Sequence, residues 1–391
     1  MNQTEQAARI PELDGLRGLA IVMVMVYHLT LLAAPFARSA FLKSTLVQAA
    51  SMGWAGVDLF FVLSGFLISS ILLKTRRDPH YFKNFYARRV LRIFPLYYLF
   101  IAVMFIFLPF FSPKLDPGVA RAGWPFFALY LHNWLYIPKF ADHFFIIVPA
   151  YISPIWSLAI EEQFYFLWPS VVYFLNRRKL FVFSIVVVVI ALLIRVSLVL
   201  FSSNWASLEY FLYYSSFTRF DGLCMGALIA LAFETERGGA VLARWAWPVL
   251  IGVVAGMIGI VLVNSNVFAL STNPLMDMWG YTLLALGAGA LIVLVTKGPA
   301  QGIVRVVFRN PILRFHGRYS YAMYLLHIPM IFLLTREFRA LGLKGDGVWF
   351  AFVGLSFGLT IVSALLTWHL LEKHAFALKR YFEYQSTKNE A

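Results

Sequence analysis

Long apolar runs recur along almost the whole of this chain of 391 residues. Hydrophobic residues make up 61% of it and charged residues 13%, whereas soluble domains are roughly 45–50% apolar and about 25% charged. A run of about 20 apolar residues can cross a lipid bilayer as one helix. The sequence therefore predicts an all-α, polytopic transmembrane bundle with about ten spans. We place them at residues 17–34, 54–73, 93–111, 155–176, 180–201, 213–233, 245–264, 278–296, 320–335 and 348–371.

The basic residues between the spans predict an orientation. An eleventh apolar stretch, 124–138, contains two prolines, His132 and Asn133, and is too short and polar for a plain span. Counting it as a span would place the basic run 177–179 outside the cell, against the excess of Lys and Arg in cytoplasmic loops. We therefore expect 124–138 to be a short re-entrant or surface helix on the outer side, with both chain termini in the cytoplasm.

Charge and cysteine content exclude several classes of function. A net charge of +14 would suggest nucleic-acid binding in a soluble protein, but here it orients the spans, so no nucleic-acid partner is expected. The single cysteine, Cys224, excludes an internal disulfide and a multi-cysteine metal site. No pair of histidines has the spacing of a helical zinc site, so no metal is expected. We expect one transmembrane domain, 9–375, followed by a cytoplasmic tail, 376–391.

The first predicted span carries an arginine and a histidine on one face. Arg17 and His28 are separated by three helical turns, or about 16 Å along the axis, and Asp14 lies one turn before Arg17. An imidazole within lipid is costly unless it faces protein or water, which makes His28 a functional candidate. The alternative is a histidine that only bonds a neighbouring helix.

A second imidazole lies in the ninth predicted span. Ser320, Tyr324 and His327 are spaced by four and then three residues, so they share one helical stripe. The hydroxyl groups could orient the His327 ring.

Carboxylates are rare inside spans and are often functional. Glu161 and Glu162 are adjacent near the start of the fourth predicted span, and Tyr165 follows Glu161 by four residues. Adjacent helical residues point about 100° apart, so only one glutamate easily faces the bundle centre with Tyr165. The functional interpretation is that the pair orients a base or substrate hydroxyls. The structural alternative is an ion pair with Arg195 or Arg219.

Three further charges lie in or at the ends of other spans. Asp58 opens the second predicted span. Arg219 and Asp221 are two residues apart and cannot face each other on one helix. We expect both of them to pair with other helices in a structural role.

The loop 74–92 is rich in arginine. Arg88 and Arg92 are four residues apart with Arg89 beside them, and Arg77 lies earlier in the loop. Guanidinium groups match phosphate oxygens in bidentate geometry, so the loop fits a donor that carries several phosphates. The alternative is a purely topological role with contacts to anionic lipid.

Five motifs taken together resemble the acyltransferase 3 family, over about residues 9 to 375. They are LDGLRG at 13–18 with His28, GVDLFFVLSGF at 56–66, RRVLRIFP at 88–95, WSLAIEEQFY at 156–165 and SYAMYLLH at 320–327. The chain departs from the family where Glu-x-Pro is common after the last span, because here Glu372 is followed by Lys373 and His374.

The resemblance implies a membrane O-acyltransferase of a bacterial inner membrane. Such an enzyme moves an acyl group, most simply acetyl from acetyl-CoA, to a sugar hydroxyl of an exopolysaccharide, lipopolysaccharide or lipid-linked glycan. His28 would be the general base or would first take the acyl group itself. The implied catalytic set is His28, Arg17, Asp14, Glu161, Glu162 and His327. We predict that coenzyme A is bound by Arg77, Arg88, Arg89 and Arg92. We predict that the acceptor is bound by Asp58, Asn133, Tyr165 and Tyr324.

Two other functions fit the same composition. A transporter or flippase of a glycan or small molecule would also carry intramembrane histidines and carboxylates, although no inverted repeat is visible. Acylation of a small secreted metabolite keeps the chemistry and changes the acceptor. The expected partners are acyl-CoA, a glycan acceptor and the lipid bilayer, and the oligomeric state, a homo-oligomer included, stays open.

Overall fold

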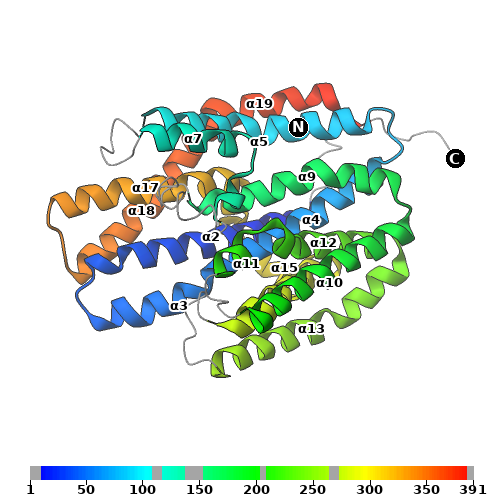
Figure 1. Ribbon diagram of the computed structural model, residues 1–391, viewed down its shortest axis with the longest axis horizontal. Coiled ribbons are helices and arrows are strands. Elements are labelled where there is room, and N and C mark those ends of the chain that lie inside the picture. The colour runs from blue at the N-terminus through cyan, green and yellow to red at the C-terminus, as the bar shows by residue number, and fades with distance from the viewer. Residues whose placement is uncertain (1–9, 108–116, 137–152, 203–207, 264–272, 385–391) are drawn as a thin grey trace.

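A computed structural model describes residues 10–107, 117–136, 153–202, 208–263 and 273–384. Within these ranges every regular element is a helix, and most of the long helices run in a common direction (Figure 1). The described residues include seven helical stretches long and apolar enough to cross a membrane. They are Pro11–Phe36, Phe41–Thr75, Arg177–Phe201, Glu209–Phe233, Glu236–Val263, Met276–Lys297 and Asp346–Phe382.

The prediction of about ten spans is therefore not confirmed. The predicted spans 93–111, 155–176 and 320–335 fall on α5 (Tyr81–Ala102), α9 (Trp156–Phe174) and α17 (Ser320–Ala340). These helices are of comparable length, but they carry the charged and polar residues that the candidate site uses. Their polarity is what separates them from the seven apolar stretches.

The stretch 124–138 does not form a continuous span. Its first part belongs to α7 (Pro117–Ala128), which has 12 residues, and a 3-10 helix follows at His132–Tyr136. Tyr130, between them, has a left-handed backbone with φ of 54°, which ends a right-handed helix. Residues 137 and 138 lie outside the described ranges.

The centre of the bundle is α2 (Pro11–Ala33), which packs against α4 (Gly56–Thr75), α16 (Pro311–Arg318), α17 and α18 (Asp346–Thr367). The contact with α16 is a seam of glycines. A Cβ atom at Gly18 would lie 1.8 Å from the Leu313 carbonyl oxygen, and one at Gly317 would lie 1.7 Å from that of Asp14. Small residues allow such close backbone approach, and the seam fixes the helix that carries Arg17 and His28.

The N-terminal end of α2 is also held by charge. Glu12 is fully buried, and its Oε1 lies 2.8 Å from Arg305 and 2.7 Å from Arg309. Arg305 belongs to α15 (Ile303–Phe308), and Arg309 is the first residue after this helix. Nothing in the sequence pattern marks Glu12, because its two partners lie almost 300 positions away.

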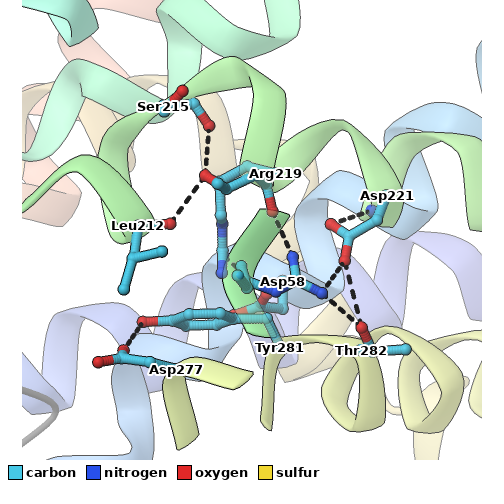
Figure 2. A network of polar contacts seen from close by, with 11 residues as sticks. Asp58, Leu212, Ser215, Arg219, Asp221, Asp277, Tyr281 and Thr282 are labelled. Atoms are coloured by element: carbon cyan, nitrogen blue, oxygen red, sulfur yellow. Dashed lines mark hydrogen bonds and ion pairs between the residues drawn. The ribbon is translucent and has the colours of Figure 1, made fainter. Parts of the chain in front are cut away.

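A second buried polar network joins α4 to α10 (Arg177–Phe201), α12 (Ser216–Phe233) and α14 (Tyr281–Lys297) (Figure 2). Arg219 Nη2 lies 2.7 Å from Asp58 Oδ1, and Arg195 Nη2 lies 2.8 Å from Asp221 Oδ2. The Arg219 guanidinium also lies over the Tyr281 ring, 4.1 Å from its centroid. The prediction that Arg219 and Asp221 pair with other helices is confirmed.

The predicted boundary between domain and tail at 375/376 falls inside α19 (Lys373–Ala377), which continues as a 3-10 helix at Leu378–Phe382. This segment packs against α5, where the Asn84 side chain donates to the Glu383 carbonyl. The boundary at 375/376 stays a prediction, and residues 385–391 lie outside the described part.

Candidate active site

The two intramembrane histidines predicted on separate spans meet in the structure. The centroids of the His28 and His327 rings are 5.1 Å apart, and His327 Nε2 lies 3.3 Å from His28 Nδ1. His327 is fully buried, whereas His28 is half-buried. His28 is therefore the more accessible residue of the pair.

Both rings are also tied to their own helices. His327 Nδ1 lies 2.7 Å from the Tyr324 carbonyl oxygen, and His28 Nδ1 lies 3.0 Å from the Val24 carbonyl oxygen. The Tyr324 hydroxyl hydrogen-bonds Ser157 Oγ at 2.6 Å and the Pro154 carbonyl, which fastens α17 to α9. The Tyr324 hydroxyl predicted for the acceptor is thus engaged within the protein.

Ser320, the third member of the predicted stripe, is also engaged, because its Oγ donates to the Gly317 carbonyl at 3.0 Å. Ser320 is the first residue of α17, and this bond ties the start of α17 to the end of α16.

The glutamate pair of α9 contacts an arginine of α5. Arg89 Nε lies 3.5 Å from Glu162 Oε1, and Arg89 Nη2 lies 3.9 Å from Glu161 Oε2. The Arg89 guanidinium stacks on the Tyr165 ring at 3.6 Å, and the Tyr165 hydroxyl donates to Glu161 at 2.8 Å. The alternative pairing with Arg195 or Arg219 is wrong, because both of those arginines bind aspartates in the network of Figure 2.

The arginines predicted for phosphate binding separate into two groups. Arg88 donates to the Phe382 carbonyl at 3.2 Å and lies over the Tyr384 ring, so it faces the C-terminal segment. Arg77 is exposed in the turn between α4 and α5. Arg88 is thus engaged at the C-terminal segment, and Arg77 is exposed just after the end of α4.

Arg92, Arg89 and Arg17 form the second group, which we call the guanidinium cluster. Each member interacts electrostatically with the other two. Arg92 is half-buried, and the Arg17 and Arg89 charges lie close to it. Like charges gathered at one place favour a bound anion. Arg17, assigned from sequence to the catalytic group, belongs to this cluster, with Asp14 as a nearby opposite charge.

Two residues predicted for the acceptor are engaged inside the protein. Asp58 is buried in its ion pair with Arg219. Asn133 is fully buried, donates to Ser216 Oγ at 3.0 Å and accepts from Gln163 Nε2 at 2.8 Å. These contacts favour structural roles for both side chains. Gln163 was not singled out by the sequence, since a glutamine beside a glutamate pair gives no distinct signal.

The guanidinium cluster and the histidine pair are joined by one helix. Arg17 and His28 both lie on the uninterrupted α2, which separates them by about 16 Å along its axis. The site can therefore hold an anion at one place and a reacting group at another, provided that a flexible arm of this length connects them.

Several curated proteins are similar to this chain. The peptidoglycan O-acetyltransferase OatA of Listeria monocytogenes is 30% identical over 389 residues, which cover 95% of this chain and 57% of that protein. The putative peptidoglycan O-acetyltransferase YrhL of Bacillus subtilis is 29% identical, over 95% of this chain and 56% of its own length. The O-acetyltransferase OatA of Staphylococcus aureus is 29% identical, over 82% of this chain and 50% of its own length.

The chain thus spans about half the length of the curated relatives it matches. No solved structure shows a significant match. The model of the family described as an acyltransferase domain matches residues 10–369, which include both histidines and the guanidinium cluster. The chain belongs to the acyltransferase 3 family.

Proposed function

We propose that this protein transfers an acyl group, most simply acetyl, from acyl-CoA to a sugar hydroxyl of a cell-envelope glycan. The observation that carries the proposal is the placement of the guanidinium cluster and the histidine pair about 16 Å apart on α2. Two of the relatives are named as a peptidoglycan O-acetyltransferase and a putative one, which supports a glycan acceptor. Peptidoglycan, exopolysaccharide, lipopolysaccharide and lipid-linked glycan all belong to this class.

Coenzyme A fits the spacing. Its phosphates are separated from the thioester by a pantetheine arm comparable to an extended chain of about five residues, or roughly 17 Å. Phosphates at the guanidinium cluster would be bound by charge-assisted hydrogen bonds. The same arm would then bring the thioester carbonyl to the half-buried face of His28.

The chemistry requires one proton acceptor. As the acceptor hydroxyl attacks the thioester carbon, His28 takes the hydroxyl proton and then returns it to the departing thiolate. In the second route, His28 attacks the thioester first, and the acyl-imidazole then reacts with the hydroxyl. Both routes use the same ring and the same donor site. In the proposed setting, a bacterial inner membrane with both termini cytoplasmic, the donor enters from the cytoplasm and meets Arg92 near the loop 74–92.

Transfer of label tests the proposal. Membranes that contain the chain are incubated with acetyl-CoA labelled in the acetyl group, and the extracted glycan is treated with mild base. We expect base-labile label on the glycan, and none when the label is in the adenine. A glycan that stays unlabelled, yet crosses the bilayer only when the chain is present, would support a carrier and contradict the enzyme.

A further inference from the structure

We propose that His327 is a positioning residue that fixes His28 with its Nε2 as the basic nitrogen. This inference rests on the proposed function, because it concerns the hydrogen bonds within the same site. Three backbone carbonyl oxygens lie within hydrogen-bond distance of the two rings.

The carbonyl oxygens near His327 determine which of its ring nitrogens carries the proton. Its Nδ1 lies 2.7 Å from the Tyr324 carbonyl oxygen and 3.2 Å from that of Met323. A carbonyl oxygen can only accept a hydrogen bond, so Nδ1 carries the proton of the neutral ring. The other nitrogen, Nε2, is then left with a lone pair.

The position of the proton on His327 determines the position of the proton on His28. Its Nδ1 faces the lone pair of His327 Nε2 at 3.3 Å and the Val24 carbonyl oxygen at 3.0 Å. Both neighbours accept, so Nδ1 of His28 carries the proton and Nε2 has the lone pair. Val24 lies on the same helix as His28, whereas His327 reaches it from α17. The contact from a second helix restrains rotation of the His28 ring.

The bond between the two histidines also stabilises the charge that forms on His28 during the reaction. When His28 Nε2 takes the proton of the acceptor hydroxyl, the ring becomes cationic, and its Nδ1–H bond to His327 becomes charge-assisted. The proton then passes from Nε2 to the leaving thiolate sulfur, and His327 ends as it began. A third group that orients a catalytic imidazole has the same logic in hydrolase triads, but here that group is neutral. Since the bond strengthens only in the transition state, its loss lowers kcat rather than raising KM.

Three variants test the hydrogen bond between His28 and His327. His327→Gln keeps an acceptor near the position of Nε2, whereas His327→Phe and His327→Leu remove it. We expect the variants without an acceptor to lose kcat by about 10- to 100-fold with little change in KM for acyl-CoA. The glutamine variant should recover most of the lost rate. Thr335→Val is the matched control, because Thr335 is buried on α17 and bonds only its own helix.

The outcomes separate this inference from the proposed function. If an apolar variant accumulates in the membrane and has the same kcat as the wild type, His327 does not position His28. The inference is also wrong if the glutamine variant is as slow as the apolar variants. Loss of activity in His28→Ala together with wild-type activity in His327→Phe would leave the enzyme in place and remove only the role of His327. Wild-type activity in His28→Ala would remove both.

Discussion

We expect the replacement of His28 with alanine to lower acyl transfer by about 10²- to 10⁴-fold, the usual contribution of a general base. The reason is that His28 is the half-buried member of the histidine pair, and fully buried His327 cannot replace it. The measurement is the initial rate of acetyl transfer, normalised to the amount of protein in the membrane. KM for acyl-CoA should change little, because the guanidinium cluster is about 16 Å away along α2.

Thr30→Val is the control for this variant. Thr30 lies on α2 close to His28 and uses its hydroxyl only within its own helix, towards Val26 and Tyr27. It should therefore keep the wild-type rate. If His28→Ala transfers acetyl as fast as Thr30→Val, His28 is not the base.

We expect the replacement of Asp58 with alanine to destabilise the fold by about 3–5 kcal/mol, because it leaves the Arg219 guanidinium buried without its carboxylate. We expect little protein in the membrane and a lower melting temperature in detergent. The partner cannot move to water, since Arg219 is 1% exposed and lies between α4, α12 and the Tyr281 ring. The network in Figure 2 would lose its link to α4.

A paired replacement separates a structural role for Asp58 from binding of the acceptor. Removing both charges, in Asp58→Leu with Arg219→Met, should restore much of the lost stability, because apolar substitutes for a buried ion pair are often tolerated. Normal stability of Asp58→Ala with a raised KM for the acceptor would instead support the substrate role first predicted from the sequence.

The sequence predicts individual helices and chemically rare residues better than their partners. His28 and His327 stand out because imidazoles are uncommon in spans, but 299 positions of chain separate them, and no local pattern shows that they meet. Arg17 and His28 could be related in advance because one helix fixes their spacing. The glutamates stood out equally, yet their partner Arg89 could not be chosen over Arg195 and Arg219.

The arginine-rich loop shows a second limit. Helical spacing grouped Arg88 with Arg92, but Arg88 is engaged by the backbone of residue 382, whose approach to α5 depends on how the last helix packs. The role of Asn133 is also decided by packing, because its partners Gln163 and Ser216 come from distant segments of the chain. Side chains that face two neighbouring helices take the partner that packing supplies, and packing is not local in sequence.

In the proposed function, the single helix α2 connects a phosphate-binding end to a catalytic imidazole across the length of the donor arm. The direct test compares kcat/KM for acetyl-CoA with that for S-acetyl-N-acetylcysteamine, which has the thioester but no phosphate, in the wild type and in Arg92→Gln. We predict that the wild type prefers acetyl-CoA by about 10²-fold or more and that Arg92→Gln loses most of this preference. Equal use of the two donors by the wild type, or an unchanged preference in Arg92→Gln, would contradict the account.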